Sequence, residues 1–304
     1  MSLLKTVYVV LRSNNMSDYI ISCCSTADLT KEHFEARDIQ YICFHYELDG
    51  VQYLDDLGTT MSFEHFYKAM TDGAQTRTSQ INASEFEEYF EPFLKEGKDI
   101  LHLAFTSGLS GTYNSCRLAA EELLEEYPER KIMVVDTKCA CLGEGLLLYY
   151  VLKKKKAGAT LEQAYAYAEE MKEHIGHYVT VDDLNHLHRG GRVSKTSAVL
   201  GSMVKIKPII IVNKEGKLEV VAKERGRKKS MNTIVDMAVE RTGDYKNEIV
   251  MITHGDCLEE AEYLAGIVRE KMGVENILIN NIGTVIGGHT GPGVLAVFAL
   301  ADHK

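Results

Sequence analysis

Hydroxyl-bearing residues and glycines gather in the segment 106–115, whose sequence is TSGLSGTYNS. The segment follows an apolar run and precedes residues whose apolar positions recur at helical spacing. A glycine such as Gly111 lets the backbone approach a ligand, and the start of a helix offers free N–H donors and a positive dipole end. Ser107, Ser110 and Thr112 add uncharged donors. The pattern indicates an anion-binding loop, with a serine cap beside a glycine turn as the alternative.

Two further segments carry polar groups of the same kind. Residues 76–80 (TRTSQ) place Thr78 and Ser79 in an expected loop just before a helix, where they would serve equally well as capping residues. Residues 287–293 (GGHTGPG) surround His289 with glycines and a proline, which indicates an unusually tight backbone. A histidine there can donate to a carboxylate or titrate near neutral pH. An incidental histidine in a turn is the alternative.

Positive charge is concentrated in one part of an acidic chain. The net charge is −10, yet residues 188–229 hold 12 Lys or Arg and 3 Asp or Glu, a local charge of +9 that leaves −19 elsewhere. Within this stretch, Arg192 offers a rigid fork of donors suited to a carboxylate or a phosphate, and Lys195, Lys205 and Lys207 follow it. The segment favours an anionic ligand or an acidic partner. Nucleic acid is disfavoured because the remaining surface would repel phosphates.

Several common chemistries lack their sequence patterns here. The chain has no G-x-S-x-G, H-E-x-x-H or G-x-x-x-x-G-K-[ST] motif. His186 and His188 lack the further ligands of a metal site, so we expect no metal. Seven cysteines without a C-x-x-C pair indicate a reducing, cytoplasmic location, and no apolar run is long enough to span a membrane. A hydrolase with Ser110 as nucleophile and His289 as base stays open, because counting residues does not exclude it.

Short apolar runs alternate with helical patterns along the chain, which predicts an α/β fold. We expect strands at 19–23, 39–45, 100–105, 131–136, 178–182, 209–212, 217–222, 249–253 and, as the last clear one, 277–282. Helices are expected at 61–70, from Ser84, at 116–127, 145–156, 160–175 and 229–241, and from a cap at Asp256 to Gly273. The helix beginning at residue 160 is expected to open a second domain, so the predicted division is 1–158 and 159–304.

Four motifs together resemble the DegV family of bacterial fatty-acid-binding proteins. In chain order they are TSQ at 78–80, S-x-L-S-G-T-Y at 107–113, L-x-R-G-G-R-V-S at 187–194 and I-G-x-V-I-G-x-H-x-G-P-G at 282–293. The resemblance extends from about residue 19 to residue 300. It implies the two-domain EDD fold, with an N-terminal parallel-sheet α/β/α domain, a C-terminal mixed-sheet α/β domain and the ligand between them.

The resemblance also implies roles for individual residues. Thr78 and Ser110 would hold the carboxylate of a long-chain fatty acid with His289 close by. Arg192 would face a partner in phosphotransfer or docking. The other residues expected at the ligand are Ser79, Ser107 and Gly111.

The implied function is that of a substrate-binding subunit without a catalytic site or a cofactor. It would present the acid to a separate ATP-binding fatty acid kinase, and a transient membrane contact is left open. The alternatives are a binder of another lipid or small anion, or the hydrolase above.

The chain departs from the family pattern in three places. Cys24-Ser25 stands where the family usually has Asp-Ser, and Ile81 stands where proline usually follows TSQ. About 16 residues precede the usual first strand. These departures concern the details of the ligand site more than the fold.

Overall fold

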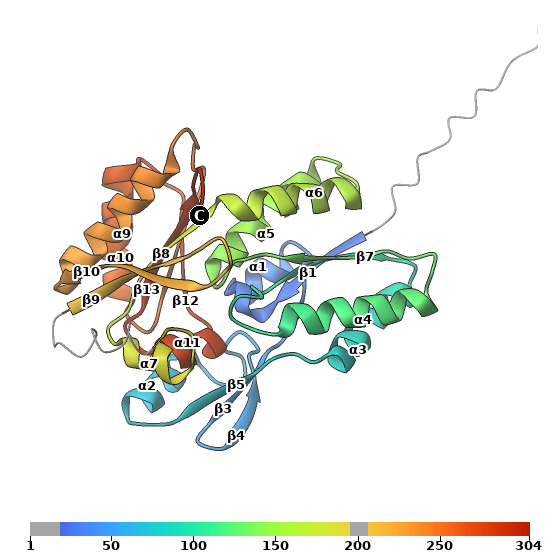
Figure 1. Ribbon diagram of the computed structural model, residues 1–304, viewed down its shortest axis with the longest axis horizontal. Helices are drawn as coiled ribbons and strands as arrows, with labels where there is room; N and C mark the ends of the chain where they lie inside the picture. Colours follow the sequence, from blue (N-terminus) through green and yellow to red (C-terminus); the bar gives the residue numbers. More distant parts are fainter. Residues whose placement is uncertain (1–18, 195–205) are drawn as a thin grey trace, which may run out of the picture.

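A computed structural model of the chain describes residues 19–194 and 206–304. Two sheets stand next to each other with helices around them, and a small third sheet lies below (Figure 1). Lys195, Lys205 and the residues before Tyr19 lie outside the described residues.

The strands of the described residues are β1 (Tyr19–Cys24), β2 (Gln40–Ile42), β3 (His45–Leu48), β4 (Val51–Leu54), β5 (Thr76–Ser79), β6 (Asp99–Ala104), β7 (Ile132–Asp136), β8 (Ile175–Thr180), β9 (Ile206–Val212), β10 (Leu218–Arg225), β11 (Val250–His254), β12 (Ile277–Asn281) and β13 (Leu295–Leu300). The α-helices are α1 (Lys31–Glu35), α2 (Phe63–Thr71), α3 (Ala83–Lys95), α4 (Thr112–Glu126), α5 (Leu142–Lys156), α6 (Leu161–Met171), α7 (Leu184–Arg189), α9 (Arg227–Thr242), α10 (Leu258–Met272) and α11 (Thr284–Thr290). Two 3₁₀ turns are η1 (Ser25–Ala27) and η2 (Lys172–His174).

The first sheet is parallel, with the strand order β2-β1-β6-β7. Every residue of β1 and β6 is buried, as expected for strands covered on both faces. Helices α3 and α4 lie on one side of this sheet and α6 on the other (Figure 1). The predicted N-terminal α/β/α layering is therefore confirmed.

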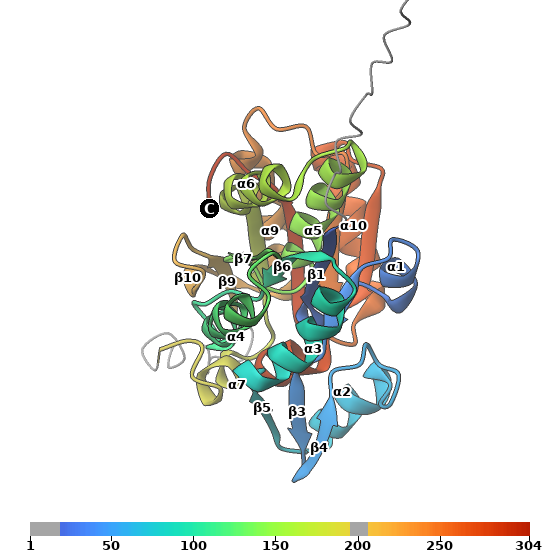
Figure 2. The same cartoon turned by 90° about the vertical axis from the view of Figure 1, so that its right-hand side faces the viewer.

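The second sheet is mixed, with the order β10-β9-β8-β13-β11-β12, and only β11 and β12 pair in parallel. Helices α9 and α10 pack on one face of it, and α5 contacts the strands β8, β11 and β13 (Figure 2). The sequence prediction ended the strands at 277–282 and was wrong there, because β13 is a fully buried strand between β8 and β11.

Helix α6 contacts β6 and β7 of the parallel sheet, and the expectation that this helix opens the second domain stays a prediction. Its predicted capping box is present, with Thr160 accepting from the Gln163 N–H at 3.3 Å and the Gln163 side chain accepting from the Thr160 N–H at 3.0 Å. The two large sheets do fall on either side of residue 158, and the boundary there stays a prediction.

The third sheet has the order β4-β3-β5 and accounts for two wrong predictions. The strand expected over 39–45 breaks after β2, where Phe44 turns the chain into the small sheet and its carbonyl accepts from the Asp55 N–H at 2.8 Å. Residues 76–79, expected as a loop, form β5 against β3. Because side chains alternate along a strand, Thr76 and Thr78 are partly buried while Arg77 and Ser79 are exposed.

Two helices also begin at other residues than the caps that the sequence predicted. Asn82, rather than Ser84, caps α3 in a capping box with Glu85. Helix α10 begins after Cys257 without a side-chain cap, so Asp256 does not cap it, although the helix ends at Gly273 as predicted. None of the described helices combines the length and apolarity needed to cross a bilayer.

Candidate functional site

A cavity of about 340 Å³ lies among all three sheets. Its walls come from the loops after β2, β6 and β7, from β5, from the inner face of β8, β9 and β13, and from α11. The carboxyl ends of β6 and β7 therefore point into it, which is where ligands bind in parallel α/β sheets.

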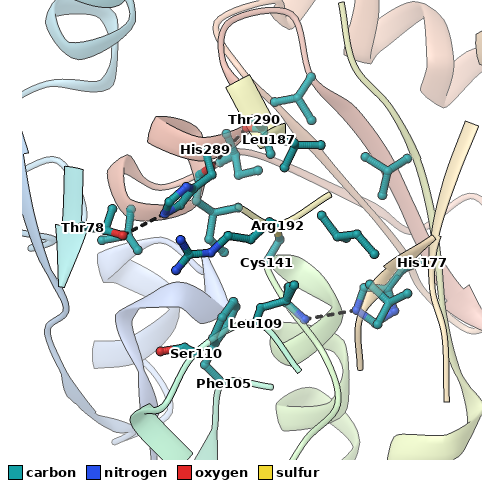
Figure 3. Close-up of a pocket in the computed structure, with 18 of the residues that line it drawn as sticks. Thr78, Phe105, Leu109, Ser110, Cys141, His177, Leu187, Arg192, His289 and Thr290 are labelled. Atoms are coloured by element: carbon teal, nitrogen blue, oxygen red, sulfur yellow. Dashed lines mark hydrogen bonds between the residues drawn. The ribbon is translucent and has the colours of Figure 1, made fainter. Parts of the chain in front are cut away.

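Polar groups gather at one end of the cavity. The Thr78 hydroxyl and the Nε2 atom of His289 are 2.8 Å apart, which joins β5 to α11. Arg192 and Ser110 also line the cavity, and Figure 3 shows the Arg192 guanidinium on the same side as Thr78 and His289. The structure thus brings to one cavity four of the residues that the sequence singled out, one from each of four separate motifs.

Ser110 lies two residues before the first residue of α4. Its hydroxyl oxygen accepts a hydrogen bond from the Thr112 N–H at 3.3 Å and lies 3.0 Å from the Thr112 hydroxyl. Gly111 is the N-cap residue of α4 and also lines the cavity. The positive end of a 15-residue helix therefore faces the polar end of the cavity.

His289 lies in the last turn of α11, whereas the sequence pattern indicated a turn. Burial, and to a smaller extent the charge of Arg192, lowers the pKa of His289 to about 4, so its imidazole is neutral at pH 7. Gly190 packs directly on this ring, and a Cβ atom at position 190 would overlap Nδ1. The first glycine of the R-G-G-R motif is therefore needed for close approach to His289.

Arg192 is partly buried, and burial lowers the pKa of its guanidinium below the usual value. It donates to the carbonyl of Gly190, and among the described residues no ion pair joins it to a carboxylate. A guanidinium keeps its charge under these conditions. An anion in the cavity would therefore gain an electrostatic partner in Arg192.

The rest of the cavity is apolar and deeply buried. Aliphatic and aromatic side chains from both large sheets line it, among them Phe44, Phe105, Val179, Ile210, Val212, Ala296 and Phe298. His177 lies opposite the polar end in Figure 3. It accepts from the Ala140 N–H through Nε2 at 3.2 Å and pairs with the Ile175 carbonyl through Nδ1 at 3.0 Å. Both ring nitrogens are therefore occupied by backbone groups.

Two predicted ligand residues are placed differently from the rest. Ser107 is exposed and is not among the residues that line the cavity. Its N–H donates to Asp136 at 3.0 Å and its hydroxyl accepts from Lys138 at 2.9 Å, so it closes a surface turn. Ser79 lines the cavity but is otherwise exposed, at the rim.

Comparison with known proteins agrees with the motifs. The pattern of the family described as "Uncharacterised protein, DegV family" matches residues 21–302. The chain belongs to the DegV family. A DegV domain-containing protein of Clostridium perfringens is 45% identical over 289 residues, which cover 95% of this chain and 99% of that protein.

Solved DegV structures have the same fold as this family member. A DegV family protein from Thermus thermophilus, whose structure was described for its fatty acid binding, has a TM-score of 0.83 at 27% identity, covering 93% of this chain and 99% of its own. A stearic-acid-binding protein from Eubacterium ventriosum has a TM-score of 0.86 at 26% identity, covering 93% and 98%.

The nucleophile and base of the hydrolase alternative, Ser110 and His289, have different hydrogen-bond partners in the DegV cavity. The Ser110 hydroxyl pairs with Thr112, and His289 pairs with Thr78. No recorded hydrogen bond joins the nucleophile Ser110 to the base His289 among the described residues. Within residues 19–194 and 206–304, no group of three or more His, Cys, Asp or Glu side chains is arranged to hold a metal ion.

Sequence reasoning on this DegV chain missed most of the cavity wall. Gln80, exposed at the rim, donates to the Ser115 hydroxyl at 3.1 Å, and its place in the TSQ motif was the available signal. Cys141 and His177 had no such signal. Cys141 has a positive φ of 53° at the N-cap of α5, and His177 lies inside an apolar strand.

A pH dependence follows from His177. Burial lowers its pKa from 6.5 to about 3, so below pH 6.5 the unfolded chain takes up a proton that the folded protein excludes. Wild-type protein should therefore lose about 2 kcal/mol relative to a His177→Gln variant between about pH 6.5 and about pH 5. Denaturant unfolding of both proteins at the two pH values measures this, because their other titrating groups cancel. An unchanged difference would contradict a neutral His177.

Proposed function

We propose that this protein binds one long-chain fatty acid in the cavity, with the carboxylate at Thr78, Ser110, His289 and Arg192. The observation that carries the proposal is a single cavity with donors and a cation at one end and apolar walls elsewhere. The solved relatives described as fatty-acid-binding support the same ligand. Ser79 and Gly111 would lie at the rim beside the head group.

The energetics suit such a ligand. Burying a methylene contributes roughly 0.8 kcal/mol, so a chain of about 14 methylenes offers on the order of 11 kcal/mol. Lost translational and conformational freedom offsets part of this. Micromolar or tighter binding therefore follows without a fully buried ion pair, which would cost much desolvation. Hydroxyls with one partly exposed guanidinium are an anchor of the required strength.

We further propose that the protein presents the carboxylate to a separate ATP-binding kinase subunit and has no catalytic site of its own. Exposure supports this orientation: Ser79 and Gly111 are exposed and Arg192 is partly so, whereas Phe298 and His177 at the apolar walls are buried. Arg192 would then contact the carboxylate and also face the partner. We place this activity in the cytoplasm, with a transient membrane contact as the source of the acid.

Mass spectrometry of lipid extracted from the purified protein tests the binding. We expect a long-chain acid at about one per chain, either as purified or after incubation with palmitic acid. Finding no bound acid after incubation would refute the proposal. Recovery of a phospholipid or an acyl ester instead would favour another lipid as the ligand. Acyl phosphate formation with a candidate kinase and ATP, dependent on this protein, tests the presentation step.

Ser110→Ala should weaken palmitic acid binding by on the order of 1–3 kcal/mol, because a donor to a charged group is lost. Ser107→Ala is the matched control, since it deletes the same atom three residues away and outside the cavity. Dissociation constants from displacement of a labelled acid measure both. Equal affinities of the Ser110→Ala and Ser107→Ala variants would remove Ser110 from the anchor.

A further inference from the structure

Helix α11 forms part of the cavity wall with Val285, Ile286 and His289, yet its ends are held by the first half of the chain. Its residues contact α7 as well as α2, β3 and β5, and Figure 1 shows it between the mixed sheet above and the small sheet below. The helix has seven residues and a glycine at its N-cap, with no side-chain cap of its own. Such a short segment has little intrinsic stability. Its position must therefore be set by what it contacts.

Two buried carboxylates hold the beginning of α11. Asp55 is 1% exposed, and its Oδ1 atom accepts from the Thr284 hydroxyl at 2.7 Å and from the Thr284 N–H at 3.3 Å. The Oδ1 atom of Asp28 accepts from the Gly283 N–H at 3.0 Å, and a Cβ at Gly283 would collide with that carboxylate. Gly283 has no side chain to cap the helix, so these two aspartates cap it instead. They precede the residues that they bind by 229 positions (Asp55) and 255 positions (Asp28).

Strand β5 holds the other end of the helix. The Thr76 hydroxyl donates to the carbonyl of Gly288 at 3.0 Å, and the Thr78 hydroxyl pairs with His289. Carbonyls at the end of a helix lack intrahelical partners, so Thr76 satisfies one of them. The helix is therefore capped at both ends by residues that precede it by more than 200 positions.

Asp55 is also fixed on its other side. Its Oδ2 atom accepts from the Ser25 hydroxyl at 2.9 Å, and the Ser25 oxygen accepts from the Phe44 N–H at 3.1 Å. Ser25 directly follows β1, and Phe44 itself lines the cavity. A continuous chain of hydrogen bonds therefore runs from the end of β1 through Asp55 to the start of α11.

We propose that Asp55 is a positioning residue for the head-group site: by holding the start of α11 it sets where His289 meets Thr78 and the ligand carboxylate. This rests on the proposed function, because it assigns His289 to the head group. Loss of Asp55 should displace His289 and so reduce recognition of the carboxylate more than recognition of the acyl chain.

The test compares palmitic acid with hexadecan-1-ol, which has the same chain without a carboxylate. In the full-length wild-type protein the acid should bind more tightly than the alcohol. Asp55→Ala should reduce this acid-over-alcohol ratio by about tenfold. Asp55→Asn should largely restore it, because the amide oxygen can still accept from Thr284. The matched control is Asp99→Ala, a buried aspartate at the amino end of β6 that accepts from the Lys131 N–H at 3.0 Å.

The outcomes distinguish a positioning role of Asp55 from a merely structural one. An Asp55→Ala protein that is less stable but keeps the wild-type ratio overturns the inference, as does an equal fall of the ratio in Asp99→Ala. If Asp55→Ala does not fold, Thr284→Val decides instead, since it removes only the hydroxyl and should lower the ratio about threefold; an unchanged ratio in that variant overturns the inference. A wild-type protein that binds neither compound refutes the proposed function itself.

Discussion

Replacing Arg192 by methionine is expected to lower the affinity for palmitic acid by about 10- to 100-fold. Hydrogen bonds to a charged group contribute roughly 1.5–3 kcal/mol, and about 1.4 kcal/mol corresponds to a tenfold change in affinity. Methionine keeps most of the apolar stem that lines the cavity, so the change removes mainly the charge and its donors. Displacement of a labelled acid measures the effect, with hexadecan-1-ol as the uncharged competitor.

Arg189→Met is the matched control for this variant. Arg189 lies three residues earlier, is exposed at the end of α7, and its guanidinium is 3.0 Å from Nδ1 of His186. Both variants change the net charge equally, but only Arg192 lines the cavity. Equal affinities in the two variants, or an equal loss for acid and alcohol in Arg192→Met, would mean that Arg192 does not contact the carboxylate. Arg192 would then act only toward the partner, as its motif first suggested.

Replacing Ala296 by leucine is expected to shorten the longest acid that the protein accepts. Ala296 is 1% exposed, lines the cavity, and pairs in register with Val179, which also lines it. Leucine adds three carbon atoms that occupy space otherwise open to the acyl chain. Excluding about three methylenes costs about 2.4 kcal/mol, or roughly 50-fold in affinity for the longest acid. Shorter acids should bind as they do to wild type.

Affinities for a series of saturated acids measure this shift, and Ala299→Leu provides the control. Ala299 is fully buried on the opposite face of β13, in the core beneath α9. Overpacking that core should lower stability by about 1–3 kcal/mol without a change in chain-length preference. A uniform loss of affinity across all chain lengths in Ala296→Leu would show that the acyl chain does not reach β13.

Periodicity and motif spacing were sufficient for much of the fold. Continuous apolar runs such as 100–105 predicted buried parallel strands, and the capping box at Thr160 predicted the start of α6 to the residue. Predictions failed where a local sequence pattern was compatible with two different secondary structures. Residues 76–79 are hydroxyl-rich and short, so nothing in their own sequence distinguished a loop from the strand that pairing with β3 makes of them.

For the site, too, the sequence predicted some features and missed others. The resemblance to the DegV family assigned Thr78, Ser110 and His289 to one carboxylate and Arg192 to a partner, and it rests on short-range features such as tight glycine turns, a helix start and an arginine fork. The sequence did not separate Ser110 from Ser107, whose hydroxyl turns outward to Lys138. That difference depends on the direction of one turn relative to β7, which sequence spacing does not encode.

Short-range patterns in the sequence therefore predicted the α/β class and an anion-binding character for the loops, and they carried the resemblance to the DegV family. The tertiary structure decided which strand lies at the centre of the mixed sheet, which apolar residues share the cavity, and how α11 is capped. The physical reason is sequence distance. Propensity and periodicity act within about one helix or strand, whereas Asp55 and Thr284, 229 residues apart, meet only when the two halves pack together.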